Sequence, residues 1–87
     1  MLITIIYNSD FHSEASSLQN DILQEWPDCN INKMGVHNSF TGAKYQVQLH
    51  TDIIYRGQTP QDNATIINSI REELEKKQQD KKKQYSI

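Results

Sequence analysis

The stretch that decides the fold is Leu2-Ile3-Thr4-Ile5-Ile6-Tyr7-Asn8-Ser9-Asp10-Phe11. Its first six residues form an apolar, β-branched run, which is typical of a buried strand. An amphipathic helical pattern begins near Ser13, a good N-cap residue. The segment from Asn8 to Phe11 is therefore a junction between a strand and a helix. Its side chains decide whether that junction is a catalytic site or a scaffold.

The composition limits the core to a small one. A chain of 87 residues forms one domain. Its apolar fraction of 36% lies below the roughly 45–50% of typical globular chains. Small domains with a thin core often add disulfides, metals or partner subunits. Because Cys29 is the single cysteine, an internal disulfide and a cysteine-based zinc site are excluded, and a partner surface remains as the stabiliser.

The charge is unevenly distributed along the chain. Residues 71–87 hold six Lys or Arg and four acidic residues, which gives a net charge of +2. Residues 1–70 hold three Lys or Arg and seven acidic residues, which gives a net charge of −4. No stretch approaches the roughly 18 consecutive apolar residues of a membrane span, and the first strand lacks the basic start of a signal peptide. We therefore expect an intracellular protein without a membrane span, located in the cytoplasm or within an organelle.

Two helices are predicted. The first carries apolar residues at helical spacing and ends before Pro27; they are Ala15, Leu18, Ile22 and Trp26. The second starts at Thr59-Pro60-Gln61-Asp62, which offers an N-cap and a proline at the first helical position. Its apolar stripe comprises Asn63/Ala64, Ile66/Ile67, Ile70 and Leu74. Beyond Leu74 the sequence to Gln84 is charged or amide, so we expect a projecting, solvated extension.

Three further strands are predicted after the first helix. Weak alternation over Cys29–Met34 indicates one strand. Clean alternation over Lys44–Leu49, followed by Ile53–Arg56 after the turn His50-Thr51-Asp52, indicates a hairpin. The order is β-α-β-β-β-α, an α/β (α+β) fold with one mixed sheet and two helices, which is the minimal thioredoxin-like arrangement. We assign residues 1–76 to this domain and residues 77–87 to a polar, Lys/Gln-rich extension.

With this order, the chain resembles the selenoprotein W family, also called the Rdx family, over about Leu2 to Leu74. The matching features are a strand ending in tyrosine, an aromatic-Pro pair closing the helix, a Thr-Gly step, an aromatic-polar-Val strand and its hairpin partner. Here they read Tyr7, Trp26-Pro27, Thr41-Gly42, Tyr45-Gln46-Val47 and Ile53-Ile54-Tyr55. A second, weaker resemblance, in element order alone, is to the thioredoxin-fold accessory subunit of respiratory complex I.

Two departures from the family pattern matter. Asn8 stands where the family has its first cysteine, and Phe11 where it has the second cysteine or selenocysteine. Neither catalytic residue carries over, so the resemblance implies no catalytic residue, no cofactor and no small-molecule substrate here. The family's hairpin turn tends to contain glycine, and His50-Thr51-Asp52 does not, which leaves the hairpin register open.

The remaining chemical groups favour no enzyme. Cys29 follows a helix C-terminus and Asp28, both of which disfavour a thiolate. His12, His37 and His50 have no short metal-ligand spacing, so no metal site is predicted. The tail that carries Lys81-Lys82-Lys83 also contains the acids Glu75 and Asp80, and we expect a solvated helix rather than a nucleic-acid interface.

These observations predict a redox-inactive binding or structural module, a small accessory subunit of a larger protein assembly. The candidate partner contacts are Asn8, Ser9, Asp10 and Phe11 at the junction and Glu72, Lys76 and Tyr85 on the second helix. Phe11 could serve as an exposed anchor or pack beneath the first helix. Two alternatives stay open: a thiol oxidoreductase acting through Cys29, and a nucleic-acid binder acting through the basic tail. A mitochondrial and a cytoskeletal assembly would both fit.

Overall fold

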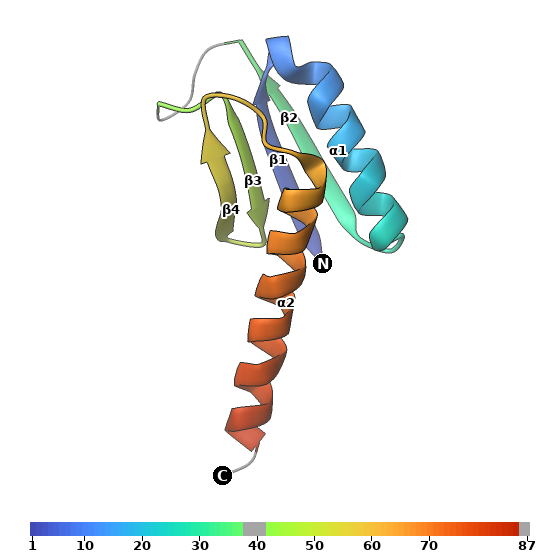
Figure 1. Cartoon of the computed structure of the whole chain (residues 1–87), viewed down its shortest axis with the longest axis vertical. Coiled ribbons are helices and arrows are strands. Elements are labelled where there is room, and N and C mark those ends of the chain that lie inside the picture. Colours follow the sequence, from blue (N-terminus) through green and yellow to red (C-terminus); the bar gives the residue numbers. More distant parts are fainter. Residues whose placement is uncertain (38–41, 86–87) are drawn as a thin grey trace.

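The chain folds in the predicted order β-α-β-β-β-α (Figure 1). The computed structural model describes residues 1–37 and 42–85, and side chains only as far as residue 76 within the last helix. Its elements are β1 (Leu2–Asn8), the 3₁₀ turn η1 (Ser9–Phe11), α1 (His12–Glu25), β2 (Asn30–Val36), β3 (Tyr45–Leu49), β4 (Asp52–Gly57) and α2 (Asn63–Tyr85). The predicted α+β class is confirmed.

The four strands form one mixed sheet in the order β2-β1-β3-β4. β1 and β2 run parallel, with Ile3 opposite Ile31, and α1 is the crossover between them. β3 lies antiparallel to both β1 and β4. This arrangement is compatible with a thioredoxin-like layout.

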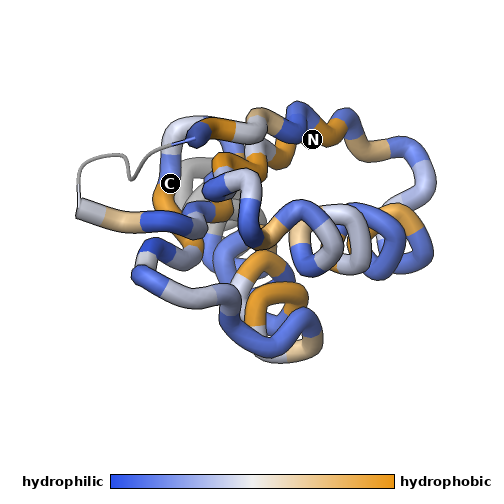
Figure 2. The backbone as a smooth tube through the Cα atoms, turned by 90° about the horizontal axis from the view of Figure 1, so that it is seen from above, coloured by the Kyte–Doolittle hydropathy of each residue, from blue (hydrophilic) through white to orange (hydrophobic). Residues whose placement is uncertain are grey.

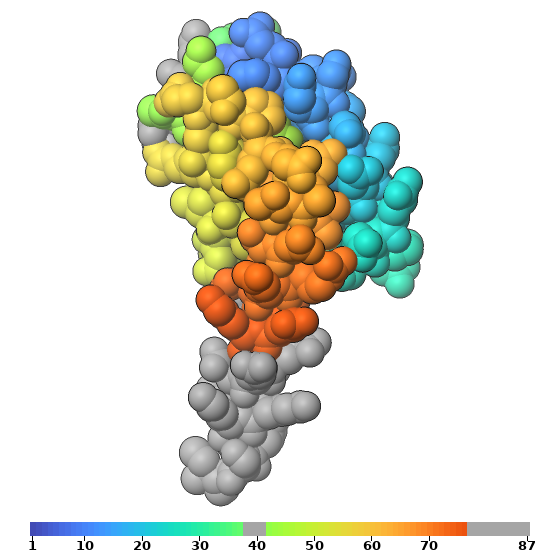
Figure 3. Space-filling view, in the orientation of Figure 1, coloured from blue at the N-terminus to red at the C-terminus, as the bar shows by residue number. Residues whose placement is uncertain are grey.

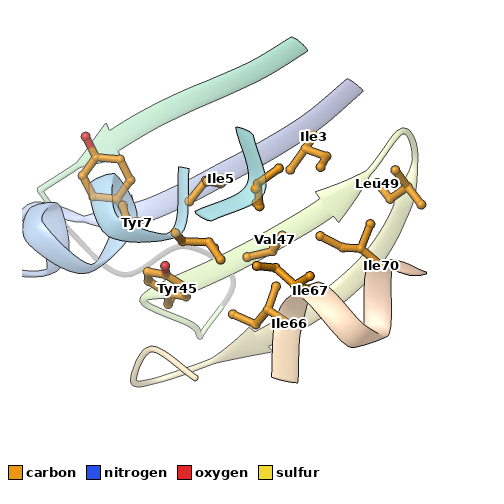
Figure 4. Close-up of a cluster of buried hydrophobic side chains, with 12 residues drawn as sticks. Ile3, Ile5, Tyr7, Tyr45, Val47, Leu49, Ile66, Ile67 and Ile70 are labelled. Carbon is orange, nitrogen blue, oxygen red and sulfur yellow. The ribbon is translucent and has the colours of Figure 1, made fainter. Parts of the chain in front are cut away.

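Both helices pack on the same face of the sheet (Figure 2). Strand residues that alternate toward this face are buried, and Figure 4 shows them meeting the isoleucines of α2. The core comprises Ile3, Ile5, Tyr7, Ala15, Leu18, Ile22, Tyr45, Val47, Leu49, Ile66, Ile67 and Ile70. The predicted apolar faces are thus confirmed for their central residues, while Trp26 and Leu74 are only partly buried against the core.

Both predicted helix starts are wrong by a few residues. Ser13 lies inside α1, because η1 precedes it and α1 already begins at His12, with no side-chain cap at Phe11. α2 begins at Asn63 rather than near Pro60, and Ile66 N–H donates to the Asp62 carbonyl at 3.1 Å. The Thr59 carbonyl instead accepts a hydrogen bond from the Tyr55 hydroxyl. Ala64 is exposed and does not belong to the buried stripe.

The strand boundaries also move slightly. β2 begins at Asn30, one residue after the predicted start, and continues to Val36; β3 begins at Tyr45 rather than Lys44. The open question of hairpin register is answered by a bulge. Val47 pairs with Tyr55 and Gln48 with Ile53, so Ile54 is the extra residue of β4. His50 turns the chain with a φ of 55°, a conformation that histidine adopts more readily than most residues.

Candidate functional site at the junction of β1 and α1

The junction lies where β1 ends and α1 begins, at the edge where a thioredoxin-like fold holds its reactive thiols. Asn8 is the last residue of β1 and pairs with Val36 of β2. The next three residues form η1, which leads directly into α1. The structure therefore places Asn8, Ser9, Asp10 and Phe11 together at the positive end of the α1 dipole.

Asn8 is buried, with 6% of its surface exposed, and its side-chain amide and backbone N–H bond to neighbouring segments. Its side-chain oxygen accepts a hydrogen bond from the Asp10 N–H at 3.0 Å, and its Nδ2 donates to the His37 carbonyl at 3.3 Å. Its backbone N–H donates to the Lys44 carbonyl at 2.8 Å. Asn8 thus joins η1, the end of β2 and the start of β3. An amide in this role offers no nucleophile.

Ser9 and Asp10 are exposed, whereas Phe11 is half-buried and packs against the core. The Phe11 ring meets Tyr45 edge to face, with centroids 6.3 Å apart and planes at 84°. Of the two roles considered for Phe11, the ring geometry matches packing beneath the start of α1. Ser9 and Asp10 are then the side chains of the junction that face solvent.

Tyr45 carries a buried hydroxyl that has no hydrogen-bond partner among the described residues. The residue is fully buried below Phe11 and beside Tyr55. Burial, and to a smaller extent the charges of Glu14 and Tyr55, raises the pKa of Tyr45 to about 12. The sequence pattern identifies Tyr45 only as a core residue, because strand alternation does not reveal where a hydroxyl finds a hydrogen-bond partner.

A tyrosine–histidine pair that the sequence pattern does not reveal lies beside the junction. The Tyr7 hydroxyl and His12 Nδ1 are 3.3 Å apart. A Cβ on Gly35 would lie 3.1 Å from the Tyr7 hydroxyl oxygen, so glycine makes room for this ring. The other two histidines, His37 and His50, are also exposed. Among the described residues, no three His, Cys, Asp or Glu side chains converge as a metal site would require.

Cys29 lies at the opposite end of α1, immediately before β2. It is partly buried against the core, and burial raises the pKa of its thiol above the ordinary value. It lines a shallow hollow together with Met1, Glu25, Trp26, Pro27 and Asp28. A raised pKa keeps the thiol protonated near neutral pH, so the environment of Cys29 does not activate it.

α2 packs on the body of the protein, as its orange part in Figure 3 shows, and then runs beyond the end of the sheet (Figure 1). Glu72 and Lys76 are exposed, and the Tyr85 side chain lies outside the described part of the chain. The helix continues to Tyr85 and crosses the predicted boundary between residues 76 and 77. Closer to the body, Arg71 bonds to Glu25 of α1 at 2.9 Å.

A polar hollow separates the middle of α1 from the start of α2. Three acidic residues line it, Glu14, Asp21 and Asp62, and no basic residue does. Asn63 crosses it, donating from Nδ2 to Asp21 Oδ2 at 2.8 Å and to Ser17 Oγ at 3.1 Å. The spacing of Glu14, Ser17 and Asp21 along one helical face was the signal that could have placed them together.

Within residues 1–37 and 42–85, no helix has the length and apolar character needed to cross a membrane. Comparison with protein-family models, with curated proteins and with solved structures gave no match to this chain. The resemblance to the selenoprotein W family stays a prediction from the sequence.

Proposed function

We propose that this protein is a redox-inactive, selenoprotein W-like binding module that acts as a small subunit of a larger protein assembly. The observation that carries the proposal is the use of Asn8. Its amide fills the position of the first family cysteine and is committed to two structural hydrogen bonds. A disulfide reductase needs a thiolate at this position, and an asparagine cannot supply one.

The surfaces available to a partner are formed by exposed residues that do not pack against the core. At the junction, Ser9 and Asp10 are exposed beside the buried Asn8. On α2, Glu72 and Lys76 are exposed on a helix that extends beyond the sheet. The small apolar fraction of the chain supports a role in which a partner surface adds to stability. A mitochondrial or a cytoskeletal assembly would provide such a partner.

Affinity purification of the native protein from its own cells, with mass spectrometry of stoichiometric partners, tests this proposal. We expect one defined complex with the wild-type protein. Asp10→Arg should reduce its recovery, since it reverses a charge at the junction. The matched control is Asn20→Arg on the exposed side of α1, which should leave recovery unchanged.

A disulfide-reduction assay on the same preparation tests the redox part of the proposal. We expect no turnover by the wild-type protein. Recovery of a free protein that reduces disulfides, with activity lost in Cys29→Ser, would overturn the proposal in favour of a thiol enzyme.

A further inference from the structure

The second face of the sheet is not covered by either helix (Figure 2). Side chains that alternate away from the core point to this face, and several of them are large and apolar. Leu2, Met34 and Ile53 are 42%, 46% and 52% exposed. Met34 pairs directly with Ile6 across the parallel strands. The same half of the face also carries the polar residues Thr4, Asn30 and Asn32, so Ile6 and Met34 form an apolar patch within a mixed surface.

Both edges of the sheet have features that discourage the addition of another strand. β4 is interrupted by the bulge at Ile54, and bulges protect sheet edges from pairing. β2 at the other edge holds Lys33, whose Nζ donates to Ser16 of α1 at 2.9 Å. A charged side chain turned inward on an edge strand has the same protective effect. Association through the sheet is therefore directed to its face.

The charge of this face differs from that of the rest of the body. The four strands contain one carboxylate, Asp52, and it pairs with Leu49, whose side chain points toward the helices. The centre of the face instead holds Gln46 and Gln48, joined by a hydrogen bond of 3.1 Å. Residues 1–70 carry a net charge of −4, so two copies repel each other through their other surfaces. On this face two copies meet without opposing carboxylates, and the charged strand residue on it is the exposed Arg56 of the edge strand β4, opposite Gln46.

We propose that this face binds a second copy of the chain, forming a two-fold dimer in which the two sheets pack face to face. Apolar side chains and glutamine amides are self-complementary, since amides both donate and accept hydrogen bonds. Sheets pack in this way about 10 Å apart. The inference goes beyond the proposed subunit role and does not depend on it, because it uses neither the junction nor the extension of α2.

The size of the face sets the expected strength of the dimer. Strands of up to seven residues, four to the sheet, give a face of about 23 Å by about 19 Å. Two such faces bury roughly 900 Å², not counting the roughness of the side-chain surface, which is below the lower limit of about 1,200 Å² for stable, specific complexes. The dimer is therefore reversible and depends on concentration.

Sedimentation velocity over a series of concentrations from about 5 to about 500 µM tests the proposal, a range chosen for a small interface. The wild-type chain should shift from monomer to dimer across it. Met34→Glu and Ile53→Glu should each weaken dimerisation at least about tenfold, because like charges then meet at the interface. Asn20→Glu, with the same charge change on the exposed side of α1, should dimerise as the wild type does.

Circular dichroism of all four proteins establishes that they are folded, which is expected because the substituted side chains are exposed. A wild-type chain that stays monomeric at the highest concentration would overturn the proposal. So would a dimer that is unaffected by both glutamate variants, since it would use another face. A heterologous partner that is lost on Met34→Glu while the wild-type chain stays monomeric would assign the face to that partner instead.

Discussion

The two ends of α1 differ in what they offer a reactive thiol: one end has an environment that would activate it, and the other end has the thiol itself. At the N-terminal end, the helix dipole would lower the pKa of a thiol, but Asn8 and Phe11 stand there. At the C-terminal end a thiol is present, Cys29, but burial raises its pKa. A reactive site needs both a nucleophile and an environment that activates it, and this chain separates the two by the length of a helix.

The largest effect is expected from Asn8→Ala at the N-terminal end. The variant loses the bond from the Asp10 N–H and the bond to the His37 carbonyl, and with them the hydrogen bonds that hold η1 and the end of β2 to β1. We expect the free energy of unfolding to fall by about 2 kcal/mol. Urea denaturation measures this change directly.

Ser9→Ala is the matched control, because Ser9 is adjacent and exposed. It should change the stability by less than about 0.5 kcal/mol. Equal losses for the two variants would mean that Asn8 is not a special structural residue, and the argument that its amide is committed to the fold would fail.

A thiol moved between the two ends of α1 is expected to change its reactivity by about tenfold. In a Cys29→Ala background, Ser9→Cys places an exposed thiol near the helix N-terminus. Its rate with iodoacetamide at pH 7 should exceed that of wild-type Cys29, which is partly buried and has a raised pKa. In concentrated urea the two proteins should react at similar rates, since both environments are lost. A faster rate for Cys29 in the folded proteins would contradict the comparison.

The element order was predictable because the apolar periodicities of this chain are long and regular. Ile3, Ile5 and Tyr7 alternate, and Leu18 and Ile22 repeat with the period of a helix. The helix starts were less predictable, because good capping residues such as Ser13 and Thr59 compete with hydrogen bonds made by nearby side chains. The Asn8 bond to Asp10 N–H created η1 ahead of Ser13, and the Tyr55 hydroxyl took the Thr59 carbonyl.

The candidate site was predictable in position but only partly in content. The strand-to-helix junction follows from the sequence pattern, and the replacement of both family cysteines is visible there. The role of Asn8 depends on His37, which lies 29 residues away along the chain. The local part of its role had a signal, since asparagine often accepts a bond from the N–H two residues later.

Tyr45→Phe tests whether the buried Tyr45 hydroxyl, which lies below the N-terminal end of α1, destabilises the fold. The Tyr45 hydroxyl is buried without a described partner, so its removal should raise the free energy of unfolding by about 1 kcal/mol at pH 7. The pH dependence has a definite sign. The pKa of Tyr45 is raised to about 12 in the folded state, so ionisation of this residue leaves the free energy of unfolding unchanged below the unfolded value of about 10. As pH rises from there toward 12, the unfolded chain loses the proton first and the free energy of unfolding falls.

Thermal unfolding from pH 8 to pH 12 checks both parts of this prediction. The wild-type protein should lose stability above about pH 10, and Tyr45→Phe should lose less. Tyr55→Phe is the contrasting variant, because its hydroxyl donates to the Thr59 carbonyl and its removal should destabilise the fold. A loss of stability at pH 7 for Tyr45→Phe would indicate that the hydroxyl has a partner after all.

The smallest effect is expected at the C-terminal end of α1, from the ion pair between Glu25 and Arg71. Both side chains are about half exposed, at 48% and 46%, so water screens the pair and it should contribute less than about 0.5 kcal/mol. A double-mutant cycle with Glu25→Ala and Arg71→Ala isolates this coupling from the bond between Arg71 and Asn68. A coupling above about 1 kcal/mol would make this end of the helix a structural clamp comparable to Asn8. A coupling energy below about 0.5 kcal/mol that vanishes at high salt would mean that polar interactions stabilise the fold more at the N-terminal end of α1 than at its C-terminal end.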